Sequence, residues 1–527
     1  MNKTHILLLI GLCLAQSSIA QDRYPKNQAA DVRHYVFNLN LEDGTDEIRG
    51  EALIEVGFKP GVQEFALDLI GKSDSFGMEV TGVLEDSVPA DYRFSDDRIR
   101  IRPAPEGPAI RTFTIRYQGI PERGLVIDTT KFGRRSFFGD NWPNLGRHWL
   151  PSVDHPYDKA SVEFRITAPD HYDVVATGRK VEESNLGNSY KLTRYSEPAP
   201  VALKVMTIGV TEFASTLLDT VGDIPVSAWV YPENRLEGFT DYALAVRVLD
   251  YFIRQIGPYS YAKLANMQAK TQWGGLENAG TISYFENSVT GNREVEGLIA
   301  HEIAHQWFGN SVTESDWNHV WVSEGFATYF AILYQESVYG NEKRKQELRL
   351  DRQQVTDYFK EHPAPIVDTT ISDPMRVLST NTYQKGGWVL NMLRHKLGDA
   401  AFWKGIREYY RIYRNGNVLT EDFRAVMERV SGEELEAFFR QWLYTPGHPE
   451  LKWRWEYRKG KVRIALEQMQ PRLFAFPLEI GIIRDGRMTV ESVSIGQGRE
   501  RLEIPVASRP EDVLLDPEVW LLFEEKQ

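Results

Sequence analysis

The spacing of apolar side chains changes twice along this chain, and each change limits the possible folds. Residues 31–230 contain short alternating or β-branched runs bounded by Gly, Pro and Asp, which predict strands. Residues 236–256 then repeat their apolar side chains at helical spacing, and Gly257-Pro258 ends that run. Strand-like patterns return after residue 447. The sequence therefore predicts a multidomain α+β protein.

The predicted domains follow these changes of period. At 527 residues the chain is too long for one hydrophobic core. We expect a β-sheet N-terminal domain at 21–232, a mainly helical domain at 233–446 and a small C-terminal β-sandwich at 447–527. Two short strands, at 264–270 and 281–285, should interrupt the helices.

The first twenty residues predict a signal peptide. Lys3 precedes a short apolar stretch at 6–14, and residues 18–20 (Ser-Ile-Ala) form a small-x-small cleavage site. The stretch is too short to cross a bilayer, so we expect export to the periplasm or out of the cell, without stable membrane insertion. A membrane-tethering or buried helix is the alternative interpretation, and Leu12 before Cys13 disfavours a lipid anchor.

The mature chain is acidic and contains no cysteine. Removing the predicted signal peptide takes the formal net charge from −13 to −14 and removes the single cysteine of the sequence. Such a chain uses no disulfide for stability. Its acidity argues against nucleic acid as a partner, because the phosphate backbone would be repelled. The charge is otherwise consistent with a role in solubility alone.

The segment His301-Glu302-Ile303-Ala304-His305 indicates a metal site. It continues an apolar helical pattern, so the two histidines lie one turn apart on one face, where both imidazoles can reach one ion. Zinc is the usual ion, at about 2 Å from each nitrogen. Glu302 lies about 100° round the helix, where a general base is needed. The pattern should occur by chance in roughly one or two such chains per hundred, so two histidines without a metal are the alternative.

Glu324 is a candidate for the third protein ligand that a catalytic zinc needs. It follows His305 after eighteen intervening residues and opens a second predicted helix. A carboxylate in the first turn of that helix could reach the same ion. By itself, however, Glu324 would more often be a solvated or capping glutamate. Nearby His319 is expected to be a packed or surface histidine rather than a partner of the ligands.

Three motifs together resemble the gluzincin zinc aminopeptidases, the family of aminopeptidase N and the leukotriene-hydrolysing aminopeptidase. The first is the histidine segment and Glu324, with the typical Gln306-Trp307-Phe308-Gly309-Asn310 continuation. The second is Gly275-Leu276-Glu277-Asn278, in which Leu replaces the family's Met, and the third is Tyr383-Gln384-Lys385-Gly386. They occur in the family's order, and the wider similarity covers nearly the whole mature chain.

The resemblance implies a fold and a metal centre. The helical domain would be thermolysin-like. One Zn²⁺ ion would be bound by His301, His305 and Glu324. Glu302 would act as the general base toward a metal-activated water, and the implied reaction is hydrolysis of the N-terminal peptide bond of a peptide.

The resemblance also implies how the substrate is bound. Glu277, with Gly275 and Asn278, would bind the α-ammonium group, so the substrates would be peptides with a free N-terminal amine. Tyr383 would donate its hydroxyl to the oxyanion that forms during the reaction. The strand at 281–284 is expected to be a sheet edge with which the substrate backbone can pair.

The chain departs from the family in two places. Relatives often carry a second amine anchor, Gln or Glu, before a Pro-x-x-Asp-x-Pro segment, which is residues 151–156 here. In the expected stretch, 139–142, this chain offers only Asp140 or Asn141 as a substitute. Many relatives also end in a helical superhelix. Since only residues 447–527 follow the helical domain, we expect a short form without it and a more open site.

Two other functions compete with a zinc aminopeptidase. A thermolysin-like metalloendopeptidase shares the metal motif but ignores the α-amine, and Glu277 argues against it. A catalytically inactive binding scaffold would be expected to have lost a ligand, the base or the tyrosine, all of which are present. The sequence predicts neither the oligomeric state nor the preferred N-terminal residue.

Overall fold

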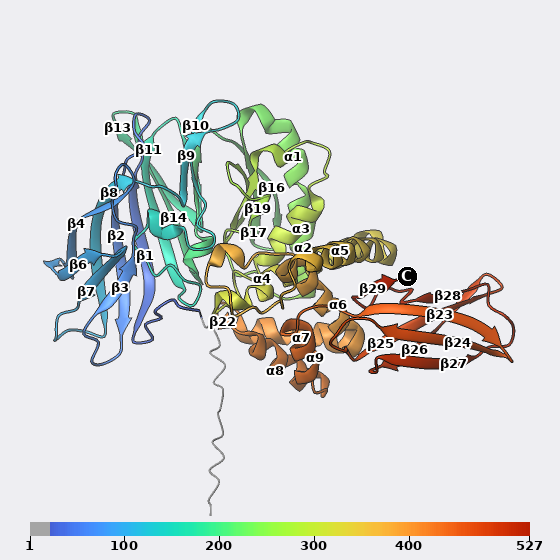
Figure 1. Ribbon diagram of the computed structural model, residues 1–527. Helices are drawn as coiled ribbons and strands as arrows, with labels where there is room; N and C mark the ends of the chain where they lie inside the picture. Colours follow the sequence, from blue (N-terminus) through green and yellow to red (C-terminus); the bar gives the residue numbers. More distant parts are fainter. Residues whose placement is uncertain (1–21) are drawn as a thin grey trace, which may run out of the picture.

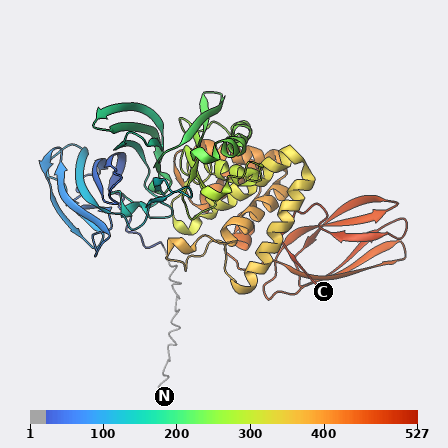
Figure 2. The same cartoon turned by 90° about the horizontal axis from the view of Figure 1, so that it is seen from above.

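The computed structural model describes residues 22–527, and Figure 1 shows them as three regions in a row. The N-terminal sheets lie at one end, helices form most of the middle region, and the last strands lie at the other end; Figure 2 gives the same order from above. This arrangement confirms the predicted α+β class, with its β-sheet N-terminal part, mainly helical middle part and C-terminal strands. The predicted signal peptide, residues 1–20, lies outside the described residues.

The N-terminal region is built around an eight-stranded sheet. Its strands are β1 (Ala30–Asn40), β2 (Ile48–Phe58), β4 (Gly77–Glu85), β5 (Val88–Pro89), β8 (Ile110–Ile120), β11 (Ala160–Pro169), β13 (Arg179–Gly187) and β14 (Tyr190–Val201). They lie in the order β13-β14-β11-β1-β2-β8-β4-β5, in which β1 and β11 run parallel. In β8, Phe113, Ile115 and Tyr117 are buried at every second position, so one face of the sheet packs on the core.

Two smaller sheets complete this region. One contains β12 (Asp173–Ala176), β15 (Ile208–Thr211), β10 (Arg135–Gly139) and β9 (Leu125–Thr129), in that order. The other contains β3 (Phe65–Asp68), β7 (Arg98–Arg102) and β6 (Asp91–Ser95), again in that order. The first of them leads through β10 into residues 139–142, the stretch in which a second amine anchor was expected.

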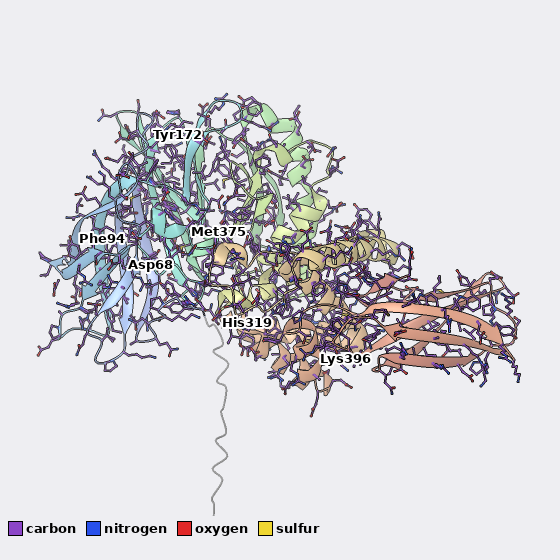
Figure 3. The ribbon with its side chains drawn as sticks, in the orientation of Figure 1. Asp68, Phe94, Tyr172, His319, Met375 and Lys396 are labelled. Carbon is purple, nitrogen blue, oxygen red and sulfur yellow. The ribbon has the colours of Figure 1, made fainter. Side chains whose placement is uncertain are left out.

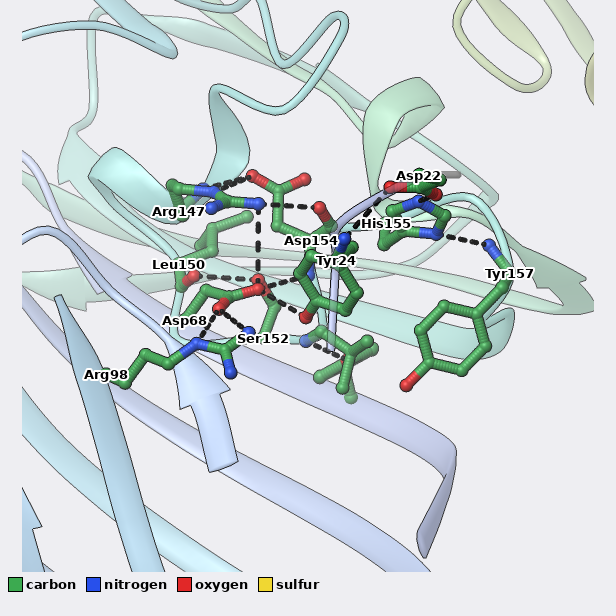
Figure 4. Close-up of polar contacts among 12 residues, drawn as sticks. Asp22, Tyr24, Asp68, Arg98, Arg147, Leu150, Ser152, Asp154, His155 and Tyr157 are labelled. Atoms are coloured by element: carbon green, nitrogen blue, oxygen red, sulfur yellow. Dashed lines mark hydrogen bonds and ion pairs between the residues drawn. The ribbon is translucent and has the colours of Figure 1, made fainter. Parts of the chain in front are cut away.

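The Pro-x-x-Asp-x-Pro segment, residues 151–156, forms a buried polar centre of the N-terminal region (Figure 4). The Asp154 carboxylate accepts hydrogen bonds from Arg147 N (2.9 Å) and Nε (3.1 Å). The Asp154 N–H donates to Asp68 Oδ2 (3.1 Å), and Asp68 Oδ1 accepts from Arg98 Nε (2.9 Å). Each of these buried carboxylates faces an arginine, and their hydrogen bonds to the backbone fix the local chain path. The motif thus has a structural role here.

The middle region contains a five-stranded sheet that includes strands on both sides of residue 232. Its members are β16 (Ala214–Val221), β17 (Ile224–Val230), β18 (Leu264–Ala269), β20 (Thr281–Phe285) and β19 (Gly275–Leu276), in that order. β17, β18 and β20 run parallel to one another. The predicted division at 232/233 therefore falls inside one sheet, and the division of the chain into domains stays a prediction.

Helices pack against this sheet and against one another. They are α1 (Arg235–Tyr242), α2 (Leu244–Gln255), α3 (Glu296–His305), α4 (Trp321–Tyr339), α5 (Asn341–Glu361), α6 (Gly386–Leu397), α7 (Asp399–Tyr413), α8 (Thr420–Ser431) and α9 (Glu436–Leu443). The run at 236–256 is two helices rather than the single one expected. The Thr240 hydroxyl bonds back to the Leu236 carbonyl (2.8 Å), an interaction that bends helices. Within residues 22–527, none of the helices is both long and apolar enough to cross a bilayer.

The C-terminal strands form two sheets. One contains β27 (Arg499–Pro505), β24 (Lys461–Gln468), β23 (Glu450–Arg458) and β29 (Glu524–Lys526); the other contains β26 (Arg487–Ile495), β25 (Phe476–Arg484) and β28 (Asp512–Leu515). Val462 and Ile464 of β24 and Leu478 and Ile480 of β25 are buried at alternate positions. Each sheet therefore presents one apolar face to the core, as expected of a sandwich.

Two lysines of the N-terminal region reach into the middle region. Lys204 Nζ lies 2.5 Å from Glu314 Oε1, and both side chains are at most 1% exposed. The ammonium group also lies over the rings of Trp142 and Trp317. Lys159 Nζ donates to the carbonyl oxygens of residues 310 and 311, at 2.9 and 2.8 Å. Both contacts fix the segment that follows α3.

Replacing Lys204 by Met should destabilise the protein by about 3–5 kcal/mol, because it leaves the Glu314 carboxylate buried without a counter-charge. The double variant Lys204→Met, Glu314→Met should recover most of that loss, since two apolar side chains of similar volume need no partner. Urea unfolding followed by tryptophan fluorescence measures both. A double variant as unstable as the single one would show that the ion pair itself stabilises the interface.

Candidate active site

Helices α3 and α4 bring three metal-binding side chains together. His301 and His305 lie one turn apart on α3, and Glu324 lies in the first turn of α4. The two Nε2 atoms are 3.0 Å apart, and Glu324 Oε2 lies 3.2 Å from His305 Nε2 and 3.6 Å from His301 Nε2. The three atoms thus form a nearly equilateral triangle, and the predicted ligands do converge.

Hydrogen bonds at the far side of the ring fix the tautomer of His305. Its Nδ1 lies 3.1 Å from the Phe308 carbonyl oxygen and 3.1 Å from Ser323 Oγ. A carbonyl only accepts, so Nδ1 carries a proton, and in the neutral imidazole the lone pair of Nε2 is directed at the triangle. Gly309 makes this contact possible, because a Cβ there would lie 2.2 Å from Ser323 Oγ.

The triangle fits a zinc ion in size and in chemistry. Donors on a tetrahedral ion at about 2.0–2.1 Å lie roughly 3.3 Å apart, which is within the observed range of 3.0–3.6 Å. The site also requires positive charge. Burial opposes a charged imidazole, yet the carboxylates of Glu324 and Glu277 raise the pKa of His305 to about 9. Three lone pairs that meet in a buried place are stabilised by a cation.

Two glycines place Tyr383 beside the triangle. Gly325 of α4 packs against Gly386 so closely that a Cβ on Gly325 would lie 2.8 Å from the Gly386 Cα. Tyr383 lies just before this crossing, in η7 (Asn381–Lys385), one turn of π-helix, a feature that is frequent at functional sites. Its ring stacks on that of His301 at 5.9 Å between centroids. Burial, reinforced by nearby carboxylates, raises the pKa of Tyr383 well above its ordinary value, so its hydroxyl remains a donor.

Glu302 lies against the backbone of Gly275. A Cβ at position 275 would be 2.3 Å from Glu302 Oε1, so only glycine leaves room for this carboxylate. Glu302 is 4% exposed, and burial raises its pKa well above the ordinary value of a glutamate. Gly275 therefore affects the site by leaving room for the Glu302 side chain.

Glu277 brings a third carboxylate to the site. Carboxylate oxygens of Glu277 and Glu302 and a ring nitrogen of His305 lie within 4.8 Å of one another. Among the described residues, Glu277 Oε1 is buried and has no hydrogen-bond partner. Asn278, in contrast, donates from Nδ2 to Ser283 Oγ (3.1 Å). Glu277 thus presents a free acceptor to the site, whereas Asn278 bonds to β20.

The two candidates for a second amine anchor differ in their hydrogen bonds. Asn141 donates to the carbonyls of Leu203 (3.3 Å) and Met206 (2.8 Å) and accepts from Trp149 Nε1 (2.8 Å), so its amide is fully used. The Asp140 carboxylate accepts side-chain bonds from Thr271 Oγ1 (2.9 Å) and Trp273 Nε1 (3.1 Å). A carboxylate can accept further bonds, so Asp140 is the better candidate of the two.

The sheet edge beside Glu277 is not the strand expected. β20 pairs with β18 on one side, and residues 283 and 284 pair with β19 on the other. β19 is therefore the edge strand, and the expectation that 281–284 forms a free edge is wrong. The short β19 pairs antiparallel with the end of β20 and so occupies the sheet edge. Next to it, the Phe285 N–H donates to the Gly274 carbonyl (3.0 Å).

His319, labelled in Figure 3, is not one of the three residues of the triangle. It ends η5 (Trp317–His319), the short turn before α4, and its Nδ1 accepts a hydrogen bond from the Thr420 N–H (3.2 Å). This is the packed histidine that was expected, and it ties α4 to the start of α8.

The sequence of this region matches one family of known proteins. Residues 241–442, which carry the three motifs and the triangle, match the peptidase family M1 domain. These residues carry an M1 peptidase domain. Its gluzincin motifs, predicted from the sequence, lie within the matched residues.

Three curated relatives named as aminopeptidases are 25–28% identical to this chain over the aligned residues. The probable aminopeptidase 2 of Sulfurisphaera tokodaii is 25% identical over 398 residues, 71% of this chain and 50% of the relative. Human glutamyl aminopeptidase is 26% identical over 327 residues, 59% of this chain and 34% of the relative. Aminopeptidase M1 of Arabidopsis thaliana is 28% identical over 328 residues, 58% of this chain and 36% of the relative. The chain thus spans half or less of the length of these relatives.

Solved structures of M1 enzymes share the fold. Aminopeptidase A of Legionella pneumophila, in complex with aspartic acid, superposes with a TM-score of 0.82 at 15% identity, covering 96% of this chain and 61% of that one. An M1 zinc metallopeptidase of Deinococcus radiodurans gives a TM-score of 0.68 at 23% identity, covering 82% of this chain and 98% of that one. The arrangement of strands and helices around the motifs is therefore that of the M1 family.

Zinc added to the metal-free chain should raise its unfolding temperature, and Glu324→Ala should abolish this rise. Binding to the folded state alone stabilises by about 4 kcal/mol at a thousandfold excess over Kd, and Glu324 supplies one corner of the triangle. Glu302→Gln is the matched control, because it changes a neighbouring buried glutamate outside the triangle. Thermal unfolding with and without zinc measures the effect; an equal rise in wild type and Glu324→Ala would contradict the ligand set.

Proposed function

We propose that this chain is a zinc-dependent aminopeptidase that removes the first residue from peptides with a free α-amine. Glu277 Oε1, which is buried and has no hydrogen-bond partner within residues 22–527, carries the proposal. A buried carboxylate oxygen without a partner is costly unless a ligand supplies the missing cation. The α-ammonium group of a peptide is such a cation, and it would lie within a few ångströms of the metal-binding triangle.

The position of Glu277 also defines which bond is cleaved. A carboxylate oxygen of Glu277, one of Glu302 and a ring nitrogen of His305 all lie within 4.8 Å of one another. An ammonium group bound there leaves room for a single residue between the amine and the carbonyl that reaches the metal. An endopeptidase has no use for a buried anchor at this distance, since the interior of a peptide carries no such charge. The aminopeptidase names of the curated relatives agree with this argument.

His301, His305 and Glu324 would hold one zinc ion per chain. When bound, the ion supplies Lewis-acid chemistry, polarising the scissile carbonyl and making a water more acidic. Glu302, whose raised pKa suits a proton carrier, would take the proton of the attacking water and pass it to the leaving amine. Tyr383, which keeps its proton, would donate a hydrogen bond to the oxyanion that forms only in the transition state.

We further propose that residues 1–20 direct export, so that the enzyme acts on peptides in the periplasm or outside the cell. The small-x-small sequence at 18–20 and the short apolar stretch before it support this proposal.

Paired peptides that differ only in N-terminal acetylation test the main proposal. The chain should release the first residue from the free-amine peptide only, because acetylation removes the charge that Glu277 binds. A zinc chelator should abolish the release, and added zinc should restore it. Mass spectrometry of the products measures both effects.

Each alternative function predicts a different result of that experiment. Cleavage of both peptides at internal bonds would show an endopeptidase. A lack of zinc-dependent cleavage of either peptide would support a binding scaffold.

Substitution of the two proton-handling groups should separate their roles. Glu302→Gln should bind zinc normally and lower kcat by about 10²–10⁴-fold, the usual contribution of a general base. Tyr383→Phe should lower kcat by about 10²–10³-fold with a nearly unchanged KM, because its bond forms only in the transition state. Steady-state kinetics on an aminoacyl arylamide measures both. Near-normal turnover by either variant would remove that residue from the mechanism.

A further inference from the structure

We propose that Gln306 and Asn310 are positioning residues that fix the distance between the Glu277 carboxylate and the metal-binding helix. This inference rests on the proposed aminopeptidase function, because the distance matters only if Glu277 binds the substrate amine. The sequence alone presents both residues as a continuation of the zinc motif and assigns them no role. The structure gives each of them a contact with the backbone of the Glu277 loop.

Gln306 bonds to the backbone on both sides of the turn that carries Glu277. It follows His305 directly, and its side chain is fully buried. Nε2 donates to the Glu277 carbonyl (2.9 Å), while Oε1 accepts from the Gly280 N–H (2.9 Å). The Gln306 side chain therefore holds two backbone groups that are three residues apart. Because Gln306 follows His305 directly, it links both groups to the metal-binding helix.

Asn310 provides a second bond to the same carbonyl. Its Nδ2 donates to the Glu277 oxygen (2.5 Å), and its side chain is fully buried as well. Asn310 is itself fixed, since its N–H donates to the His305 carbonyl (3.1 Å) and its carbonyl accepts from Lys159 Nζ (2.9 Å). The Glu277 backbone thus receives two side-chain donors from the segment that contains His305.

The loop needs these contacts because little else ties it to α3. Glu277 follows β19, a two-residue edge strand preceded by Gly274, and glycine leaves the backbone many conformations. The Ala279 N–H donates to the Val205 carbonyl (2.8 Å), but that bond ties the loop to the N-terminal region rather than to α3. Since Glu277 Oε1 has no partner within residues 22–527, that oxygen does not hold the loop. The distance from anchor to metal therefore depends on Gln306 and Asn310.

Gln306→Met tests the inference, because methionine keeps the volume and removes both hydrogen bonds. Gln268→Met is the matched control. Gln268 is equally buried and also bonds to two backbone groups, the Tyr231 N–H (2.9 Å) and the Glu286 carbonyl (2.8 Å), without touching the Glu277 loop. The substrates are an aminoacyl arylamide with a free α-amine and its des-amino counterpart.

We expect Gln306→Met to raise KM for the free-amine substrate about tenfold. This is roughly the value of one hydrogen bond to a charged group, here the bond between the displaced Glu277 carboxylate and the substrate ammonium. Its kcat/KM for the des-amino substrate and its zinc content should equal those of wild type. Gln268→Met should lower the unfolding temperature by a similar amount and leave the preference for the free amine unchanged. This split separates positioning of the anchor from a general loss of stability.

Three results would overturn the inference. An unchanged free-amine preference in Gln306→Met would show that the bond to Glu277 only stabilises the fold. An equal loss of the free-amine preference in Gln306→Met and Gln268→Met would also show that the bond to Glu277 only stabilises the fold. A wild type without any free-amine preference would overturn the proposed function together with the inference, and only this result affects both. If Gln306→Met does not fold, Asn310→Ser, which removes the other donor to the Glu277 carbonyl, is judged by the same criteria.

Discussion

The convergence of three lone pairs in a buried place is the constraint on which the rest of the structure depends. His301 Nε2, His305 Nε2 and Glu324 Oε2 lie 3.0–3.6 Å apart, a spacing at which their lone pairs repel unless a proton or a metal ion lies between them. Without a positive charge this arrangement would lose free energy through both desolvation and repulsion. The fold must therefore supply enough stability elsewhere to keep the three atoms together, and the close packing at Gly309 and at the Gly325–Gly386 crossing helps to hold them.

Much of that support comes from residues far away in the sequence. Lys159 and Lys204, from the N-terminal region, bond to the segment that follows α3, which is residues 309–314. Asn310 in the same segment bonds to the Glu277 loop. The N-terminal sheets are thus a structural part of the site although none of the proposed metal ligands comes from them. A lysine is suited to this role because its long stem crosses the interface while its ammonium group donates to several backbone carbonyls at once.

The sequence predicted the parts of the site that are set by local periodicity. The spacing of His301 and His305 on one helix follows from 3.6 residues per turn, and the run after Glu324 has the apolar pattern of a helix. The hydrophobic patterns likewise gave the strand, helix and strand regions in the right order. What the sequence could not give is the pairing of distant segments. The π-helical turn at Tyr383 and the edge position of β19 depend on tertiary contacts that compete with local propensity. Gly325 and Gly386 are both visible in the sequence, but hydrophobic periodicity does not show that the two glycines pack against each other.

The same reasoning explains why specificity is harder to predict than chemistry in this family. An endopeptidase and an aminopeptidase can share the histidines, the third ligand and the base, since all four groups act on the reacting carbonyl and the attacking water. The two differ in whether a cation site stands at a fixed distance from that centre. In this chain the distance is set by two side-chain amides that bond to one main-chain carbonyl. Every residue has a backbone carbonyl, so a sequence motif cannot show which carbonyl a side chain binds. In the sequence, Gln306 and Asn310 are visible only as residues that follow the zinc motif. The structure turns those accompanying residues into a geometric constraint on which bond can reach the metal.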